Sequence, residues 1–355
     1  MSVVDKYLND EVLIQSMTDM RLQVGLPPFV NINCRWMPHP KLKEPMTQSE
    51  MVDFISETHR ANIEGDLKDE KTVDFCFDAM IGGIPHRFRG HQSENYRGVA
   101  LDIRILRSAI DPLPALGFPA ALGPQLFSKK SGLVIIGGPT GSGKSTTLSS
   151  LVRAFAETYP GSHIVSLEDP VEYVFNWEHS LISQKHVGYH VENWSEGIYK
   201  AKREKPNLII IGEVRTPDAI QAAVEAACSG HMVITTMHAD RIPRVLDAIV
   251  DNHPQEMARS IQTKLSYILR GVICQTLVPT HVTDGSWTRP TLVYEILANE
   301  NTPVQSTLLH GTWASFEVKS IEDQKSVSKS WEKRILELET SGQISPETAQ
   351  SLKTR

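Results

Sequence analysis

Residues 138–145 read Gly-Pro-Thr-Gly-Ser-Gly-Lys-Ser, which fits the phosphate-binding pattern G-x-x-x-x-G-K-[ST]. The apolar stretch from Leu133 to Ile136 precedes it and predicts a buried strand, and the stretch from Thr146 to Val152 predicts a helix. A glycine-rich loop between a strand and a helix lets backbone N–H groups and the helix dipole surround phosphate oxygens. The sequence therefore predicts a nucleotide-binding loop.

The residue types of this loop predict separate roles. Lys144 would reach the β- and γ-phosphates of ATP, and the Ser145 hydroxyl would ligate Mg²⁺. A glycine-rich turn that only packed a helix on a strand would not require Lys-Ser at its end. The predicted nucleotide-binding residues are Gly138, Pro139, Thr140, Gly141, Ser142, Gly143, Lys144, Ser145 and Thr146.

Length and composition indicate a globular protein of about two domains. The chain has 355 residues, of which 40% are hydrophobic and 22% charged, and no apolar run approaches the ~20 residues of a membrane-spanning helix. The N-terminus does not resemble a secretion signal, so we expect a cytoplasmic protein. The formal net charge of −6 disfavours bulk binding of nucleic acid. The four cysteines are scattered singly, which favours neither a zinc site nor disulfides.

The order of the predicted elements changes at a Pro-rich connector. Residues 1–106 predict a small α+β domain, which opens with one helix carrying Leu8, Val12, Leu13 and Met17 and contains a hairpin across Gly82-Gly83. Residues 107–119 are predicted to form a hinge or linker. Residues 120–355 alternate apolar strands with helices and end in two helices, which predicts a parallel α/β domain.

Two acidic clusters follow apolar strands of this second domain. Ligands bind at the carboxyl ends of parallel strands, so both clusters are candidate site residues. Glu168, Asp169 and Glu172 follow the strand at 163–167 and could activate water or hold Mg²⁺, although a solvated acidic turn is the alternative. Glu213 follows Ile209 to Gly212 in an unusual Walker B pattern; the alternative is an exposed glutamate paired with Arg215.

Two further groups are weaker candidates. Thr235, Thr236 and His238 follow a third apolar strand, where their polar groups could sense a γ-phosphate, although a lone histidine is usually structural. Arginines in the N-terminal domain could act as arginine fingers on a nucleotide or could simply face solvent. These arginines are Arg87, Arg89, Arg97 and Arg104.

These motifs and their order resemble the secretion-superfamily ATPases of type II and type IV secretion, pilus retraction and conjugation, the PilT-like proteins. The resemblance covers nearly the whole chain. Besides the phosphate loop it rests on an Asp box at residues 168–172, a Walker B motif at 212–215, a His box at 230–238 and an Arg-bearing segment at 86–104.

The resemblance implies a RecA-like ATPase domain preceded by a PAS-like domain, a homo-hexameric ring and ATP with Mg²⁺ bound between the domains. It implies Glu168 as general base, Glu213 near Mg²⁺ and the attacking water, and His238 as the γ-phosphate sensor. It also implies that Arg87, Arg97 and Arg104 are candidate fingers. The ring would associate peripherally with inner-membrane components of a secretion or conjugation apparatus.

Departures from the family pattern favour one branch. The long N-terminal extension and tetracysteine module of assembly ATPases are missing, and residues 303–309 match poorly the AIRNLI-like segment of retraction ATPases. The chain therefore most resembles the DotB/TraJ-type ATPases of type IVB secretion and plasmid conjugation. A pilus-retraction ATPase is the alternative. A small-molecule P-loop kinase, a non-hydrolysing nucleotide-binding scaffold and a nucleic-acid motor are less favoured, and no sequence-specific nucleic-acid binding is expected.

Overall fold

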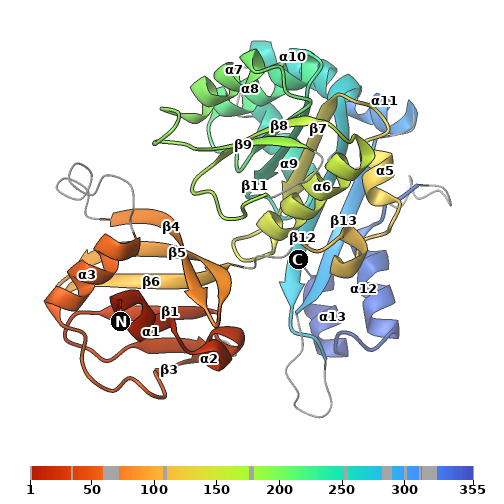
Figure 1. The fold of residues 1–355 in the computed structure, drawn as a ribbon. Helices are drawn as coiled ribbons and strands as arrows, with labels where there is room; N and C mark the ends of the chain where they lie inside the picture. The colour runs from red at the N-terminus through yellow and green to blue at the C-terminus, as the bar shows by residue number, and fades with distance from the viewer. Residues whose placement is uncertain are drawn as a thin grey trace. The chain divides into compact units, whose positions relative to one another are not determined.

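The computed structural model describes residues 2–32, 35–58, 72–106, 110–175, 180–251, 255–281, 290–299, 302–311, 313 and 326–354. The chain divides into two compact units (Figure 1). The first consists of Met1–Ala109 and Pro170–Val174, and the second of Ile110–Asp169 and Phe175–Arg355. A short piece of chain from the middle of the sequence thus belongs to the N-terminal unit.

The first unit is a mixed α+β structure. Its described strands form one six-stranded sheet in the order β3-β2-β1-β6-β5-β4, with every pair antiparallel. Helices and sheet share a core in which Phe54, Phe77 and Phe88 are buried. The elements are α1 (Val3–Leu8), α2 (Glu11–Ser16), β1 (Asp19–Gln23), β2 (Phe29–Ile32), β3 (Arg35–Pro38), α3 (Gln48–Thr58), β4 (Thr72–Ile81), β5 (Ile84–Asn95) and β6 (Gly98–Leu106).

The N-terminal segment differs from the single helix that the sequence predicts. The chain forms α1 and α2 instead, because the Asp10 side chain accepts a hydrogen bond from the N–H of Leu13 and begins a new helix. This break rotates the following residues, so that Leu13 and Ile14 are buried whereas Val12 is 79% exposed. The prediction of one helix with Val12 on its apolar face is therefore wrong.

The second unit is built on a seven-stranded sheet among the described residues, in the order β13-β12-β7-β11-β10-β8-β9. All neighbours are parallel except β12 and β13. The elements are η1 (Leu113–Leu116), α5 (Leu122–Leu126), β7 (Gly132–Gly137), α6 (Lys144–Thr158), β8 (His163–Glu168), β9 (Leu181–His186), α7 (Trp194–Arg203), β10 (Leu208–Ile211), α8 (Pro217–Cys228), β11 (Met232–Met237), α9 (Ile242–Asp251), α10 (Gln255–Ile268), β12 (Leu269–Val278), β13 (Thr291–Ala298), α11 (Thr302–His310), α12 (Trp331–Thr340) and α13 (Pro346–Lys353).

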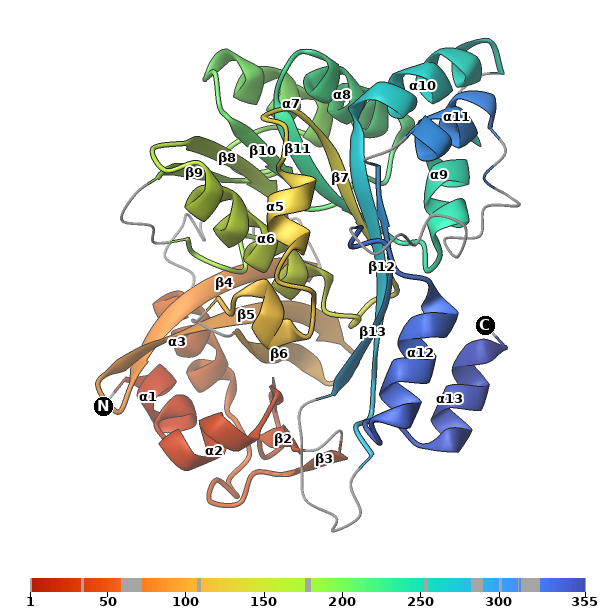
Figure 2. The same ribbon diagram turned by 90° about the vertical axis from the view of Figure 1, so that its right-hand side faces the viewer.

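Helices cover this second sheet, as the turned view shows (Figure 2). One face of the central strands packs against α7, α8, α9 and α10 in a single apolar core. The helix α6 lies against β7 and β11 and buries Leu151, Val152 and Phe155. The pair α12 and α13 packs beside β13 in a smaller cluster around Trp331 and Ile335.

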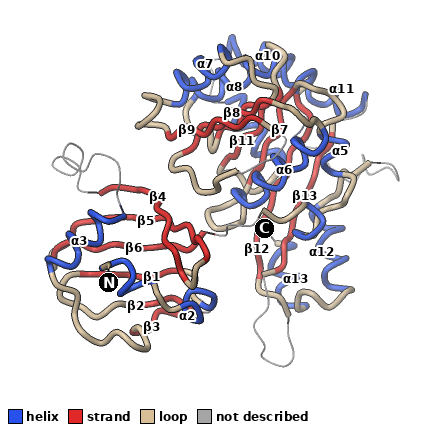
Figure 3. Tube along the Cα trace, in the orientation of Figure 1, coloured by secondary structure: helices blue, strands red, loops and turns tan. Residues whose placement is uncertain are grey.

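The predicted fold class is confirmed by this arrangement of helices and strands (Figure 3). The hairpin across Gly82-Gly83 is present as β4 and β5, and the two predicted helices at the end of the second domain are α12 and α13. The sequence did not predict β3, β9, β13 or α10. Part of the predicted connector forms η1, and residues 107–109 lie outside the described residues. None of the described helices is long and apolar enough to span a bilayer.

The break between α1 and α2 can be tested by a matched pair of alanine variants. Leu13→Ala removes a buried side chain and should lower the free energy of unfolding of the first unit by about 2–5 kcal/mol. Val12→Ala changes an exposed side chain and should stay within about 0.5 kcal/mol of wild type. Urea unfolding followed by circular dichroism measures both. Equal losses would instead support one continuous helix.

Candidate nucleotide-binding site

The loop between β7 and α6 has the backbone that a phosphate-binding loop requires. Gly138, Gly141 and Gly143 have φ values of 154°, 77° and 85°, a region that residues with a Cβ rarely adopt. A Cβ on Gly138 would also lie 2.5 Å from both the Gln275 carbonyl oxygen and the Ser142 Oγ. No side chain caps α6, because Gly143 occupies the N-cap position. The N-terminal N–H groups of α6 therefore suit an anion.

Lys144 is the first residue of α6 and folds back over this loop. Its Nζ donates hydrogen bonds to the carbonyl oxygens of Gly138 at 2.8 Å and Pro139 at 3.0 Å. Burial lowers the pKa of Lys144, while the negative charge of Glu213 acts in the opposite direction. The structure therefore brings together the phosphate loop and the predicted Walker B glutamate.

Glu213 lies just beyond the end of β10, beside an arginine and a histidine. Its Oε1 is 2.6 Å from a guanidinium nitrogen of Arg215, and its Oε2 is 3.3 Å from Nε2 of His238. The pair with Arg215 is the one foreseen as the alternative to a catalytic role. The side chain of Glu213 is nevertheless only 19% exposed, and besides its contact with His238 its charge acts on Lys144. This combination is what a hydrolytic site needs and an isolated surface pair lacks.

The two threonines before His238 have different surroundings. Thr236 Oγ1 donates a hydrogen bond to the Gly212 carbonyl at 2.6 Å, and the Val214 N–H donates to the Thr236 carbonyl at 3.1 Å. Thr236 therefore holds the turn that carries Glu213. Among the described residues, Thr235 Oγ1 is buried without a hydrogen-bond partner. The two hydroxyls thus differ, because that of Thr236 is engaged in the turn whereas that of Thr235 is not, and a sensing role for them stays a prediction.

Glu168 is buried at the end of β8. Its Oε1 accepts hydrogen bonds from Ser166 Oγ at 2.7 Å and from Gln184 Nε2 at 3.0 Å. A Cβ on Gly212 would lie 3.5 Å from the Glu168 Cα, so the Asp box and the Walker B turn are neighbours. Gln184 comes from β9, a strand that the sequence did not predict, and its role was therefore missed.

The predicted arginine fingers lie in the first unit. Arg87 donates to the carbonyl oxygens of Val171 and Glu172, each at 3.0 Å, and pairs with Asp78. Arg104 pairs with Asp19 at 2.9 Å.

Arg97 differs from these two arginines. It is exposed in the turn between β5 and β6, and no ion pair of Arg97 is found within the described part of the chain. Of the three predicted arginine fingers, Arg97 is therefore the one without an ion pair among the described residues.

The site has unused polar atoms that suit a bound nucleotide. Ser142 Oγ, Thr235 Oγ1 and Gln275 Oε1 are buried and lack a hydrogen-bond partner among the described residues. Gln275 also donates through Nε2 to the Ser142 carbonyl at 2.7 Å, which places it beside the phosphate loop. No cluster of three or more metal-ligating side chains occurs within the described ranges. Mg²⁺ usually takes several of its ligands from phosphate and water, so a magnesium ion bound with nucleotide at this loop would need few protein ligands.

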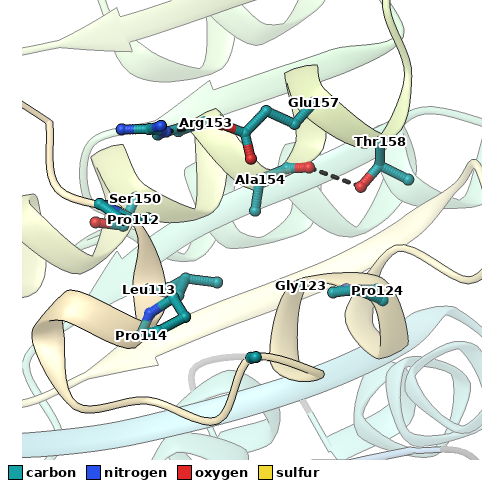
Figure 4. Close-up of a pocket in the computed structure, with 11 residues that line it drawn as sticks. Pro112, Leu113, Pro114, Gly123, Pro124, Ser150, Arg153, Ala154, Glu157 and Thr158 are labelled. Atoms are coloured by element: carbon teal, nitrogen blue, oxygen red, sulfur yellow. Dashed lines mark hydrogen bonds and ion pairs between the residues drawn. The ribbon is translucent and has the colours of Figure 1, made fainter.

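A pocket lies beside the C-terminal half of α6 (Figure 4). None of the residues that line it belongs to the phosphate loop. Its volume is about 340 Å³, and its lining includes Leu113 and Pro114 of the connector and Arg153 of α6. The connector is bound there, since Ser150 Oγ donates to the Asp111 carbonyl at 2.6 Å and Arg153 donates to the Ile110 carbonyl at 2.8 Å. The segment predicted as a hinge therefore includes residues anchored to the helix that begins at the phosphate loop.

The fold and this site together define a P-loop nucleotide hydrolase. Residues 96–338 match the family described as "Type II/IV secretion system protein". The chain is also 32% identical over 270 residues to the type IV pilus retraction ATPase PilT of Pseudomonas aeruginosa, covering 74% of this chain and 75% of that protein. The chain therefore belongs to the type II/IV secretion ATPase family, and it is an ATPase of the secretion and pilus superfamily.

Another relative and two solved structures refine this comparison. YggR of Escherichia coli, an uncharacterised protein, is 36% identical over 191 residues, which cover 54% of this chain and 58% of YggR. The pilus retraction motor PilT with bound ADP superimposes with a TM-score of 0.85 at 27% identity, covering 99% of this chain and 97% of PilT. The ATPase DotB of Legionella pneumophila gives 0.77 at 24% identity, covering 96% and 92%, and shows the shared fold alone.

The hydrogen bond from Thr236 predicts a difference between two substitutions. Thr236→Val removes the donor to the Gly212 carbonyl and should lower both kcat and the unfolding free energy, the latter by about 1–3 kcal/mol. Thr236→Ser keeps the hydroxyl and should retain most of the wild-type turnover. Steady-state ATPase assays and thermal unfolding measure the two effects. Equal behaviour of the two variants would show that the hydroxyl is not needed.

Proposed function

We propose that this chain is a motor that hydrolyses ATP at the phosphate loop and uses the energy to drive a pilus or secretion machine. The observation that carries the proposal is the position of Glu213 at the edge of the sheet, where its carboxylate lies 3.3 Å from Nε2 of His238 and acts electrostatically on Lys144 of the phosphate loop. The membership of the chain in a family of secretion ATPases supports it. A carboxylate that contacts a histidine and acts on the lysine of a phosphate loop suits phosphoryl transfer to water.

The proposed roles follow from the position of each side chain. Residues 138–146 bind the phosphates of ATP, with Lys144 on the β- and γ-phosphates. Glu168 acts as general base, since it lies beside the Walker B turn and is held in place by Ser166 and Gln184. His238 detects the γ-phosphate through its contact with Glu213. Ser145 and Glu213 would hold Mg²⁺ directly or through water, and the ion would neutralise charge on the phosphates.

The motor is proposed to be a homo-hexamer at the cytoplasmic face of the inner membrane, attached peripherally to components of its machine. Arg87, Arg97 and Arg104 are proposed to complete a nucleotide site as arginine fingers. The anchoring of the connector on α6 supports transmission of the hydrolysis step, because α6 carries the phosphate loop at one end and binds Ile110 and Asp111 further along. The mechanical step of the motor would be a rotation of one unit relative to the other.

Two machines remain candidates for this motor. Similarity to PilT over three quarters of the chain favours pilus retraction. The poor match of residues 303–309 to the retraction segment favours a type IVB secretion or conjugative machine. In the structure Val304 and Leu308 of this segment are buried, so apolar residues are required there for packing as well. The genes that neighbour this one would separate the alternatives, since pilin genes and conjugation genes accompany different machines.

Two single substitutions test the hydrolytic site. Glu213→Gln should leave ATP binding within a few-fold of wild type and lower kcat by about 10²-fold or more, because it removes a charge needed in the transition state. Lys144→Ala should instead weaken ATP binding itself. Nucleotide titration and steady-state turnover distinguish the two effects. Glu225→Gln on the exposed side of α8 is the matched control and should behave as wild type. Normal turnover of Glu213→Gln would contradict the assignment.

The ring predicts that activity depends on assembly. ATPase activity per subunit should rise with protein concentration as subunits associate, while mass measurement at the same concentrations should show a shift from monomer to hexamer. Arg97→Ala should lower kcat with little effect on assembly, because Arg97 is exposed and acts on nucleotide. Constant activity per subunit in a strictly monomeric protein would refute the ring.

A further inference from the structure

The loop that carries His238 is fixed at its far end by a residue from another part of the chain. Residues 238–241 connect β11 to α9, and the N–H of Ile242 at the start of α9 donates a 2.6 Å hydrogen bond to Oε1 of Glu295 on β13. Only 3% of the Glu295 side chain is exposed. The carboxylate of Glu295 is thus buried at the N-terminus of α9, where the helix dipole favours a negative charge.

Arg241 is the counter-ion of this buried carboxylate. Its Nε and one terminal nitrogen lie 3.2 Å from the two oxygens of Glu295. Its guanidinium also lies 5.4 Å from the ring centre of Trp331 and 3.7 Å from Glu332, both in the first turn of α12. Burial raises the pKa of Glu295, and the charge of Arg241 acts against this shift. Arg241 therefore joins the His238 loop to β13 and to α12.

The same loop touches the base of the phosphate loop. A Cβ on Gly137, the last residue of β7, would lie 2.5 Å from the Ala239 carbonyl oxygen and 2.8 Å from Cys274 Sγ. Ala239 therefore packs directly on the strand end from which the phosphate loop begins. The loop therefore contacts Gly137 on one side and Glu295 on the other, and these contacts restrict movement of His238.

We propose that Arg241 is a positioning residue for ATP hydrolysis, which clamps the His238 loop between Glu295 and Trp331 so that His238 meets Glu213. This inference rests on the proposed role of His238 and assigns a task to the C-terminal helix α12. The helix supports the back of the nucleotide site through Trp331 and Glu332. A change in the packing of α12 would therefore alter the position of His238 through the side chain of Arg241.

The first experiment separates positioning from binding. Arg241→Ala should lower kcat by about tenfold or more, since small displacements of a catalytic group have large effects on rate. The dissociation constant for ADP should stay within about twofold, because the phosphate loop itself is unchanged. Hydrogen exchange at the start of α9 should accelerate, because Glu295, the hydrogen-bond acceptor of the Ile242 N–H, is no longer held by Arg241. A wild-type kcat in a folded Arg241→Ala variant would overturn the proposal.

A double-variant cycle tests whether Arg241 acts through His238. In a His238→Ala background, Arg241→Ala should lower kcat by less than about twofold further, because the group that it positions is already gone. Fully multiplied effects of the two substitutions would overturn the inference while leaving the role of His238 intact. If His238→Ala alone kept wild-type turnover, the proposed role of His238 would be refuted first, and the positioning role with it.

Two further variants distinguish a loss of positioning from a folding defect. Arg241→Met combined with Glu295→Gln replaces the buried ion pair by neutral side chains of similar size, so it should fold and still lose turnover. Arg334 is the matched control, because it also links α12 to β13, through the Tyr294 ring at 4.6 Å and the Leu292 carbonyl at 3.2 Å, without contacting the His238 loop. Arg334→Ala should keep kcat within about twofold. An equal loss there would show general loosening of α12 and overturn the proposal.

Discussion

Parallel pairing of the central strands is the constraint on which the candidate site depends. Ile211 on β10 pairs with Leu167 on β8 and with Thr235 on β11, while Met237 on β11 pairs with Gly137 on β7. In this register all four strands end at one edge of the sheet, which is where ligands bind in such folds. The phosphate loop, the Asp box, the Walker B turn and the His box therefore meet without any long connection.

Local signals explain how much of this the sequence could predict. The phosphate loop needs glycines at positive φ and a lysine at its end, and both requirements are visible in eight consecutive residues. Unbroken apolar runs predicted the buried strands, and a polar residue directly after each run predicted the site edge. Glu168, Glu213 and His238 were found in this way, because each lies within two residues of the strand that positions it.

Other features of the fold and the site could not be predicted, because they depend on contacts between residues far apart in the chain. A local sequence pattern does not indicate such contacts. Gln184 reaches Glu168 from a strand with no continuous apolar run, and Glu295 lies 53 residues from the N–H that it accepts. The error at Val12 has a different, local cause. Helical periodicity continued through Asn9 and Asp10, but the Asp10 side chain accepts a hydrogen bond from the Leu13 N–H and begins a second helix there.

The course of the chain links the catalytic edge to the first unit. The chain passes from the second unit to the first between Asp169 and Pro170, one residue after the end of β8, and returns between Val174 and Phe175. The intervening residues 170–174 are bound to Arg87 and Arg89 of β5, through two carbonyl oxygens and through the Glu172 carboxylate at 2.9 Å. Because Glu168 ends β8 directly before this crossing, it lies next to one of the places where the chain passes between the two units. The covalent path therefore makes the position of Glu168, the proposed general base, sensitive to movement of the unit that carries Arg87 and Arg89.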